Sequence, residues 1–573
     1  MTDAIVIGAG HNGLVAANVL ADAGWSVLVV EAQPQPGGAV RSAALTIPGY
    51  RHDVFSAFYP LAVASPVMRA LELERYGLVW RRAPLVLAHP RPGGRCAVLS
   101  MDLATTCASL DRFHTGDGEA WQAMISEWRE VADLALGAIF RPFPPLAPVA
   151  RLLGRVGFDQ ALRLVRQALL PVRQMATERF AGEGAALVLA GLALHSDLAP
   201  ESTLSAAYGW LLACLGQTHG FPVPEGGAAA LTDALVRRLE ARGAVVQCAS
   251  AAKQVIVRSG RAVGVRLQDG TELRARRTVL AAVAAPILYG ALLDAADLPP
   301  GLSRDLRNFQ WDHGTVKVDW ALDGPVPWEA AEARQAGTVH VADDLDDLTR
   351  YSAQLATAQL PDRPFLVFGQ QAVADPTRAP AGHDTAWAYT RVPRRLVRDA
   401  AGVIDVTAGW LEPFAERVEQ RIERYAPGFR SRIVGRHVLG PKELEELNPS
   451  LVGGAINGGT AQLHQQLVLR PLPGLGRPAT PIGNLYLASS SAHPGGGVHG
   501  APGANAARRP ASKAALSRPI SPATRGARAP RTDRAAHGDR GDRSGNPKRP
   551  GSRRTHPRSS ARRDVPRGQA VPA

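Results

Sequence analysis

Hydrophobic and polar positions at the start of the chain alternate in the order of a βαβ unit. Residues 4–7 form a short apolar run that leads directly into a Gly-x-Gly-x-x-Gly motif. Small and apolar residues continue over 14–24, and a second, mostly apolar run covers 26–30. Short apolar runs bounded by glycine are typical of buried strands, whereas the longer stretch of small residues favours a helix. The pattern therefore predicts strand, glycine turn, helix and strand.

The glycines of this motif have the spacing of a dinucleotide-binding turn. Gly8 permits the tight turn, Gly10 lets the backbone approach a pyrophosphate, and Gly13 lets the helix pack closely on the strand. The N-terminus of the helix then faces the phosphate charge. Glu31 ends the second strand, where a carboxylate binds ribose hydroxyls, and no arginine follows it to hold a 2′-phosphate. The absence of such an arginine disfavours NADP. The alternative interpretation, a glycine-rich turn without a nucleotide, would give no reason for Glu31 at the end of the strand.

A second glycine motif favours FAD over NAD. Gly37 and Gly38 come shortly after Glu31, in a segment that is also rich in proline. The pair resembles the second diphosphate-contacting motif of the glutathione-reductase-like flavoproteins. An arginine directly follows the pair in many of those proteins, but Ala39 stands there in this chain, so Arg41 is the candidate phosphate ligand. A surface turn is the alternative interpretation.

A third glycine motif lies near the opposite end of the chain. An apolar strand at 483–488 leads into a loop with Gly496, Gly497 and Val498, and a small-residue helix follows. We expect this loop to run beside the flavin ring, because glycine lets backbone amides come close to a ligand. One FAD held by both ends of the chain accounts for all three motifs.

Further motifs resemble those of the phytoene desaturase-related FAD oxidoreductases, especially the branch with the animal pyridine nucleotide-disulphide oxidoreductase domain-containing protein. The segments that carry this resemblance are 48–56, 192–197, 220–227, 317–328, 453–459 and 493–497. The resemblance covers residues 1–509. It implies an α/β fold of the glutathione-reductase-like FAD-binding Rossmann type, with FAD held non-covalently and a mixed α+β substrate lobe. It also implies that a backbone group near Val255 contacts the adenine.

Two lobes are expected to alternate along the chain. The FAD-binding lobe is predicted from segments 1–60, 221–299 and 471–509, because a helix, a strand and a β-meander return in the middle one. The substrate lobe is predicted from 61–220, which is mainly helical, and 300–470, which mixes strands and helices. Residues 510–573 contain no Phe, Trp or Tyr and are rich in Arg, Pro, Ser and Gly. This composition predicts a basic disordered tail.

The net charge of +14 is concentrated in that tail. Residues 511–573 hold 16 Lys plus Arg against 4 Asp and no Glu, which gives +12 and leaves +2 on the rest of the chain. A basic tail can bind nucleic acid or an anionic membrane. A solvated extension, or the product of a shifted reading frame, accounts for the composition as well. We therefore do not expect a nucleic-acid partner.

Other features of the sequence indicate where the protein is located and which reactions it does not catalyse. No apolar run of about 18 residues predicts a membrane span, and no signal peptide is recognised, so a cytoplasmic location is expected. Residues 134–173 combine apolar side chains with spaced arginines, which is typical either of a packed surface helix or of one lying on the inner face of a membrane. The cysteines form no C-x-x-C pair, so neither disulphide-reductase chemistry nor a metal site is expected. They are Cys96, Cys107, Cys214 and Cys248.

The predicted reaction needs few catalytic side chains, because a flavin itself accepts the hydride. His499 and His493 flank the C-terminal glycine loop and are candidates for a proton relay, although a histidine that only fixes the loop is the alternative. His195 and Asp197 are further candidates. No second strand-bound glycine motif indicates an NAD(P)H domain, so oxygen, a quinone or a carrier would accept the electrons.

Three classes of function stay open at the sequence level. The resemblance implies hydride transfer between FAD and an apolar small molecule, such as a polyene or a lipid. A flavin amine or amino-acid oxidase shares the N-terminal motif and would show an aromatic cage at the flavin. A non-catalytic FAD-bearing regulator would bind the cofactor without being reduced by any donor.

Overall fold

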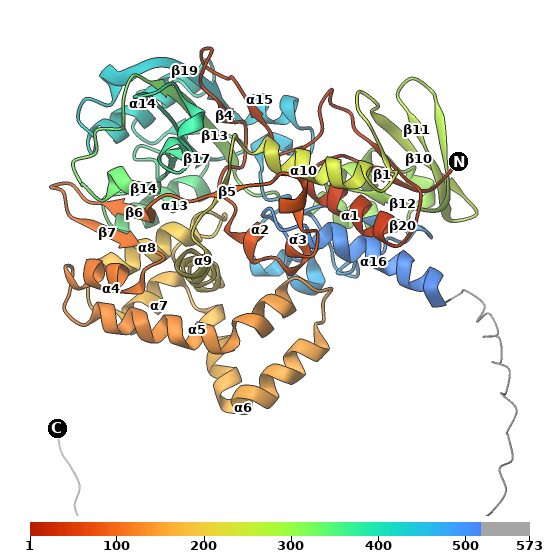
Figure 1. The fold of residues 1–573 in the computed structure, drawn as a ribbon, viewed down its shortest axis with the longest axis horizontal. Helices are drawn as coiled ribbons and strands as arrows, with labels where there is room; N and C mark the ends of the chain where they lie inside the picture. The colour runs from red at the N-terminus through yellow and green to blue at the C-terminus, as the bar shows by residue number, and fades with distance from the viewer. Residues whose placement is uncertain (517–573) are drawn as a thin grey trace, which may run out of the picture. The chain divides into compact units, whose positions relative to one another are not determined.

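Two large sheets form the centres of two lobes (Figure 1). The computed structural model describes the backbone of residues 1–516 and the side chains up to residue 512. The chain passes from one lobe to the other several times, so that segments far apart in sequence share a sheet. This arrangement gives the α/β architecture that the sequence predicts.

The first sheet carries the N-terminal motif at its centre. Its strands follow the order β10-β11-β12-β1-β2-β9, and β20 pairs with β12. β1 is parallel to both neighbours, whereas β10, β11 and the first part of β12 form the predicted antiparallel meander. The strands are β1 (Thr2–Ile7), β2 (Val27–Val30), β9 (Val245–Gln247), β10 (Ala252–Arg258), β11 (Arg261–Leu267), β12 (Glu272–Ala281) and β20 (Leu485–Leu487).

Two glycines set the distance between helix α1 and its neighbours. A Cβ atom on Gly13 would lie 2.0 Å from the carbonyl oxygen of Gly8, and one on Gly503 would lie 2.0 Å from that of Asn12. Any side chain would therefore push α1 away from the sheet or from α16. The helices of this lobe are α1 (His11–Asp22), α2 (Pro60–Ala64), α3 (Pro66–Arg69), α10 (Ala229–Glu240), α11 (Ala285–Gly290), α12 (Leu302–Arg307) and α16 (Ala501–Leu516).

Helix α16 continues through Pro510. The first residues of the segment predicted as a tail are thus helical up to Leu516. The remainder of the predicted tail lies outside the described residues.

The second sheet is buried on both faces. Its order is β19-β13-β17-β16-β14-β6-β7. Apolar side chains of β13 pack on helix α14 (Leu411–Glu423), and helices α8 (Glu183–Ala193) and α9 (Ser205–His219) cover the other face. β6 and β7 come from the segment predicted as mainly helical. The strands are β6 (Leu85–Pro90), β7 (Cys96–Leu99), β13 (Gly314–Leu322), β14 (Ala336–Val341), β16 (Leu366–Gly369), β17 (Asp384–Val392) and β19 (Ile433–Leu439).

The remaining elements are mostly helices around this second sheet. The helices are α4 (Leu103–Asp111), α5 (Asp117–Ile139), α6 (Leu146–Leu169), α7 (Val172–Arg179), α13 (Leu345–Ala356) and α15 (Pro441–Leu447). Short paired strands complete the fold, namely β3 (Ser42–Ala43), β4 (His52–Asp53), β5 (Trp80–Arg81), β8 (Val223–Pro224), β15 (Gln359–Leu360) and β18 (Arg398–Asp399).

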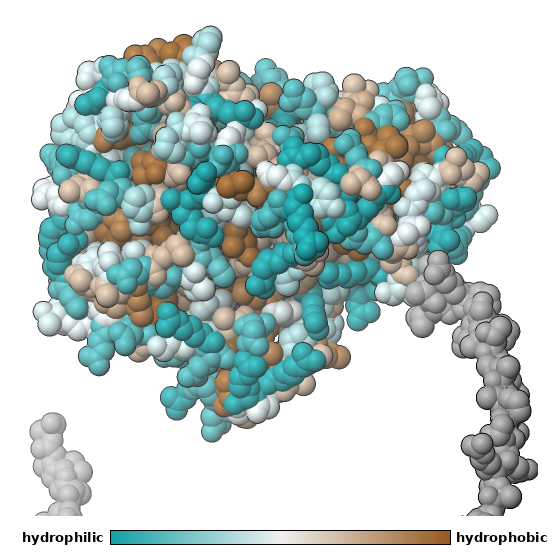
Figure 2. Space-filling view, in the orientation of Figure 1, coloured by the Kyte–Doolittle hydropathy of each residue, from teal (hydrophilic) through white to brown (hydrophobic). Residues whose placement is uncertain are grey.

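Helix α6 exposes apolar side chains on both of its halves. The helix is broken at Gly157, whose φ of 76° and ψ of 170° are not helical. Apolar and polar residues lie side by side over this helix (Figure 2, lower edge). The exposed apolar residues are Leu146, Val149, Leu153, Phe158, Leu162, Val165 and Leu169. None of the helices within residues 1–516 has both the length and the hydropathy to cross a bilayer.

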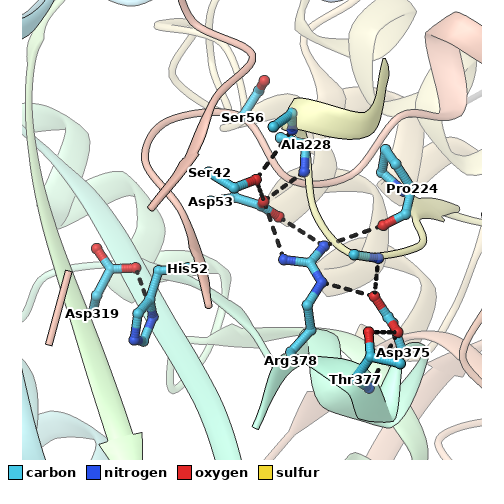
Figure 3. A network of polar contacts seen from close by, with 12 residues as sticks. Ser42, His52, Asp53, Ser56, Pro224, Ala228, Asp319, Asp375, Thr377 and Arg378 are labelled. Carbon is cyan, nitrogen blue, oxygen red and sulfur yellow. Dashed lines mark hydrogen bonds and ion pairs between the residues drawn. The ribbon is translucent and has the colours of Figure 1, made fainter. Parts of the chain in front are cut away.

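A buried ion-pair network joins the two lobes (Figure 3). The guanidinium of Arg378 donates to both carboxylate oxygens of Asp53, at 3.1 and 3.2 Å, and its Nε donates to Asp375 at 2.8 Å. The same carboxylates accept from the backbone amides of Ala228, at 2.7 Å, and Gly226, at 2.8 Å. Three distant segments therefore meet at one buried arginine.

Candidate active site

A cavity of about 1120 Å³ brings most of the predicted cofactor-binding residues together. It extends from the N-terminal glycine motif to helices α5 and α6. The predicted residues on its wall are Gly8, Gly10, Gly13, Glu31, Gly38, Gly496, Gly497 and Val498, together with His493, His499 and His195. All three glycine motifs thus contribute to one site.

The two N-terminal glycine motifs lie directly against each other. Gly8 has a φ of 95°, in the region that favours glycine. The backbone amide of Gly37 donates to the carbonyl oxygen of Ala9 at 2.8 Å. A Cβ atom on Gly38 would lie only 2.9 Å from the Cα of Gly10. Gly8, Gly10 and Gly38 together form a glycine cradle, in which backbone atoms approach each other too closely to admit side chains. This leaves space for a diphosphate, and the N-terminus of α1 faces the cavity.

Glu31 is held in a fixed position at the end of β2. Its Oε2 accepts from the backbone amide of Ala9 at 2.7 Å, and its Oε1 accepts from that of Gln33 at 2.9 Å. Each carboxylate oxygen can accept a second hydrogen bond. Glu31 thus fits the expected contact with the ribose hydroxyls of a dinucleotide.

Three predicted cofactor contacts do not lie on the cavity wall. Gly37 supports the cradle from outside through its bond to Ala9. Arg41 donates to the carbonyl oxygen of Leu447 at 2.8 Å, and its guanidinium stacks over Phe55. The amide of Val255 donates to the carbonyl oxygen of Leu292 at 2.8 Å. In place of Val255, the residues of this region on the wall are Ala251, Ala252 and Gln268.

The two candidate histidines of the C-terminal loop have different surroundings. Nδ1 of His499 accepts from the amide of Ala501 at 3.2 Å, and its Nε2 lies 3.3 Å from the carbonyl oxygen of Gly496. Burial lowers the pKa of His499 to about 3, so the ring is neutral and holds the loop. Burial also lowers the pKa of His493 to about 4, but neither of its ring nitrogens has a hydrogen-bond partner among the described residues.

Arg470 stands behind the C-terminal loop and was not predicted from the sequence. Its buried guanidinium donates to the carbonyl oxygens of Thr460 at 2.9 Å, Asn457 at 3.0 Å and Ser490 at 2.7 Å. Burial lowers its pKa, and no carboxylate pairs with it among the described residues. Arg470 therefore places a positive charge in the cavity wall and fixes the loop that faces Gly496.

The polar face of β13 forms another part of the wall. Lys317 forms an ion pair with Asp319, and Nδ1 of His52 lies 3.6 Å from the same carboxylate. Burial alone would raise the pKa of Asp319, but the neighbouring ammonium holds it below its usual value. The Lys317 ammonium lies 5.7 Å from the ring of Trp387, which stacks on Tyr389. The sequence marked this segment only through its resemblance to a family.

The side chain of Asp197 connects two segments of the chain. Its carboxylate accepts from the hydroxyl of Thr460 at 2.6 Å and from the amide of Ala461 at 2.7 Å. It thereby ties the end of α8 to the loop that Arg470 holds.

The end of the cavity opposite the glycine motifs is apolar. Helices α5 and α6 supply its wall, and the residues from these two helices are Trp128, Val131, Ala135, Ile139, Val149, Leu152, Leu153, Phe158, Ala161, Leu162, Leu164, Val165 and Ala168. Several of these side chains are also exposed to solvent, so α6 forms a rim of the cavity. An apolar ligand can therefore contact apolar side chains along this whole end.

A comparison with protein families identifies the fold and the cofactor class. The family of flavin containing amine oxidoreductases matches residues 13–509. This chain belongs to that family. Its site is accordingly that of an FAD-dependent oxidoreductase, which confirms the enzyme class and the cofactor predicted from the glycine motifs.

Similar proteins include pyridine nucleotide-disulfide oxidoreductase domain-containing protein 2 of Mus musculus, which is 29% identical over 88% of this chain and 92% of that protein. A limonene dehydrogenase subunit of Castellaniella defragrans is 24% identical over 90% and 95% of the two chains. The neurosporene-forming phytoene desaturase of Rhodobacter capsulatus is 26% identical over 87% and 91%. The predicted relationship to the phytoene desaturases is thus confirmed.

Solved structures share the fold. A redesigned Putrescine Oxidase is 18% identical and covers 90% of this chain and 99% of its own, with a TM-score of 0.58. At this identity the likeness concerns the fold alone. It confirms the predicted FAD-binding Rossmann-type fold with a mixed α+β substrate lobe.

Proposed function

We propose that this protein dehydrogenates an apolar, hydrocarbon-like molecule. The observation that carries the proposal is the continuous cavity, which joins the glycine cradle to the apolar wall of α5 and α6. An aliphatic or polyene substrate loses little solvation in such a wall, whereas a polar one would leave its hydrogen-bonding groups unpaired. Two similar proteins are also named after reactions of hydrocarbons.

The described residues divide the work between binding of the cofactor and binding of the substrate. Gly8, Gly10 and Gly38 would receive the FAD diphosphate, and Glu31 would bind the ribose. FAD, when bound, would supply the acceptor for a hydride, which carries both electrons of the broken C–H bond. The positive charge of Arg470 stabilises negative charge that develops nearby during reduction. The α5–α6 wall would bind the apolar part of the substrate away from the glycine motifs.

A flavin amine oxidase is the second candidate function. The stacked pair of Trp387 and Tyr389 on the cavity wall offers the aromatic surface expected of such an enzyme. However, Asp319, the carboxylate near this aromatic pair, is already occupied by Lys317 and is not available to bind a substrate ammonium. The local charge therefore favours a neutral substrate.

Anaerobic bleaching of the flavin absorption tests the choice. We expect phytoene in phosphatidylcholine vesicles to bleach the FAD-loaded protein, and putrescine to leave it oxidised. Ala135→Phe, which narrows the apolar end, should slow bleaching, while Ala150→Phe on the exposed side of α6 should not. Bleaching by amines only would favour the oxidase. Bleaching by neither would favour the FAD-bearing regulator.

We also propose that α6 lies in the surface of a membrane, from which the substrate enters. Its exposed apolar side chains lie at the cavity rim, as an entry from lipid requires. Arg155 and Arg166 form ion pairs with Asp133 and Glu178, whereas Arg151 and Arg163 form none within the described part of the chain. Apolar side chains beside arginines fit a lipid interface. The inner face of a membrane is the location we propose.

Vesicle flotation of the full chain tests this contact. Phe158→Ser and Leu162→Ser should reduce flotation with phosphatidylcholine vesicles, because both side chains are more than half exposed, at 68% and 52%. Val403→Ser, exposed elsewhere at 79%, is the matched control. Vesicles with phosphatidylserine measure any added contribution of the basic tail. Equal flotation of all variants on neutral vesicles would contradict the proposal.

A further inference from the structure

Two buried histidines form a pair at the cavity wall. His195 follows α8 and lines the cavity, and its Nε2 lies 2.8 Å from Nε2 of His340 on β14. We propose that His195 accepts the proton that the substrate loses during oxidation, and that His340 positions His195 and shares the resulting charge. This inference rests on the proposed dehydrogenation.

The contact between the two rings leaves one nitrogen of His195 free for a ligand. We assign the tautomers in which Nε2–H of His195 donates to Nε2 of His340; Nδ1 of His195 then carries no proton, and it has no hydrogen-bond partner among the described residues. His340 packs closely on α8, since a Cβ atom added to Gly191 would lie 2.3 Å from its Nδ1, and the ring centroid of Phe365 lies 5.4 Å from that of His340. His195 thus lines the cavity in contact with a closely packed His340.

His195 lies close in the fold to the loop that faces the flavin motif. Asp197, two residues further on, binds Thr460 and Ala461. The same loop approaches the C-terminal glycine motif, since a Cβ atom on Gly496 would lie 3.1 Å from the Cα of Asn457. The histidine pair is thus connected to the reacting end of the cavity through one loop.

The charges around the pair keep it neutral before the reaction. Burial lowers the pKa of His195 to about 4, and Arg391, which donates to the carbonyl oxygen of His195 at 3.1 Å, acts in the same direction. Burial lowers the pKa of His340 as well, and His89 packs against its ring. The other titratable side chains on the adjoining elements that share the wall are Lys317 of β13, Tyr389 of β17, Tyr208 of α9 and Arg470.

The other bases at the wall are less suited to accept a proton. Lys317 and Asp319 are engaged with each other in an ion pair. His493 has no hydrogen-bonded partner among the described residues that could share a positive charge. When His195 becomes an imidazolium, its Nε2–H can donate to the neutral His340, which delocalises the charge.

The proposed step is balanced. One substrate carbon loses a hydride, with both electrons of its C–H bond, to oxidised FAD. The adjacent carbon loses a proton to Nδ1 of His195, and the electrons of that bond form the new C=C bond. FAD is reduced, the substrate is oxidised and His195 becomes cationic. Positive charge that builds up as the hydride leaves acidifies the adjacent C–H bond, so a weak base is sufficient.

Stopped-flow reduction of the FAD-loaded protein by phytoene in phosphatidylcholine vesicles tests the role over a range of pH. His195→Gln should slow reduction about a hundredfold or more and remove the fall in rate on the acid side, with the FAD content unchanged. His340→Leu should slow it less and shift that acid fall to lower pH, since leucine offers the imidazolium no acceptor. The exposed His464→Gln should match the parent protein. A parental rate and pH profile in His195→Gln would overturn the proposal.

Carbethoxylation with diethyl pyrocarbonate, mapped by mass spectrometry, tests His195 without turnover. We expect His195 and the exposed His464 to react in the FAD-loaded protein and His340 to remain unmodified. An unreacted His195 beside a reacted His464 would overturn the proposal. If phytoene fails to reduce the parent flavin, the hydrocarbon substrate is wrong, and this modification experiment still decides whether His195 has a free basic nitrogen.

Discussion

At the scale of single residues, the flavin site depends on glycines, because a Cβ atom at these positions would clash with neighbouring backbone. Gly13 of α1 and Gly137 of α5 both lie within helices, but their surroundings differ. A Cβ atom on Gly13 would lie 2.0 Å from a backbone carbonyl, whereas one on Gly137 would meet nothing within 4 Å. The same substitution therefore has opposite consequences at the two positions.

We predict that Gly13→Ala strongly lowers FAD content and thermal stability, because α1 must move away from the turn that receives the diphosphate. Gly137→Ala should raise the free energy of unfolding by about 0.5–1 kcal/mol through the higher helix propensity of alanine. Differential scanning fluorimetry and the flavin absorption of the purified variants measure both effects. Similar behaviour of the two variants would contradict the packing argument.

Asp384 gives a pH-dependent prediction. Burial raises its pKa from 3.8 to about 7, and its Oδ1 has no hydrogen-bond partner among the described residues. The folded state thus holds a proton that the unfolded chain releases near pH 4, so stability falls as the pH rises from about 4 to 7. Asp384→Asn should stabilise the protein at pH 8 by about 2–4 kcal/mol, since one pKa unit corresponds to about 1.4 kcal/mol.

Chemical denaturation at pH 8 and pH 4 measures this effect. The gain from Asp384→Asn should be largest at pH 8 and small at pH 4, where the carboxyl is protonated. Asp297→Asn, at an exposed position, should change stability little at either pH. A gain that is independent of pH would show that Asp384 is not the titrating group.

At the scale of elements, the lobes are joined by the network around Arg378. Its side chain is fully buried and bridges Asp53 of β4 to Asp375. We predict that Arg378→Met lowers the free energy of unfolding by about 3–5 kcal/mol, because it leaves buried carboxylates without a partner. Equilibrium denaturation measures the loss.

Two further variants separate charge from packing at this junction. Adding Asp53→Asn to Arg378→Met should recover part of the stability, since one uncompensated charge is removed. Arg155→Met breaks an exposed ion pair with Asp133 and should have no measurable effect. If Arg378→Met proves as mild as Arg155→Met, the network does not hold the lobes together.

At the scale of the whole molecule, the cofactor site is assembled from both ends of the chain. The wall includes residues after β1 and residues before α16. We predict that FAD at about 100 times its Kd raises the free energy of unfolding by about 2.7 kcal/mol, because only the folded chain forms the site. Thermal melts of apoprotein with added FAD measure this gain. Glu31→Ala should reduce it, the exposed Glu240→Ala should not, and an equal gain in both would contradict the role of Glu31.

Local sequence was sufficient to predict the FAD-binding motifs. The order of strand, Gly8, Gly10, Gly13, helix and Glu31 is set by contacts within about thirty residues, so its periodicity is visible in the chain. The β-meander and the C-terminal glycine loop were found for the same reason.

Other parts of the site depend on contacts between segments that are distant in sequence. Strands β6 and β7 join a sheet whose other members begin at Gly314, and no local pattern shows that pairing. Arg41 and Val255 are near the expected positions in sequence, but neither lies on the cavity wall. Nη2 of Arg41 and the amide of Val255 donate instead to the backbone carbonyls of Leu447 and Leu292. The position of Arg470 in the cavity wall and the contact of His195 with His340 arise only because segments distant in sequence meet. The sequence by itself thus determined the family of the fold and its cofactor, because the glycine motifs depend on contacts between residues that are close together in the sequence. Only the tertiary structure decided which charges and bases face the substrate, because burial and long-range packing bring them together.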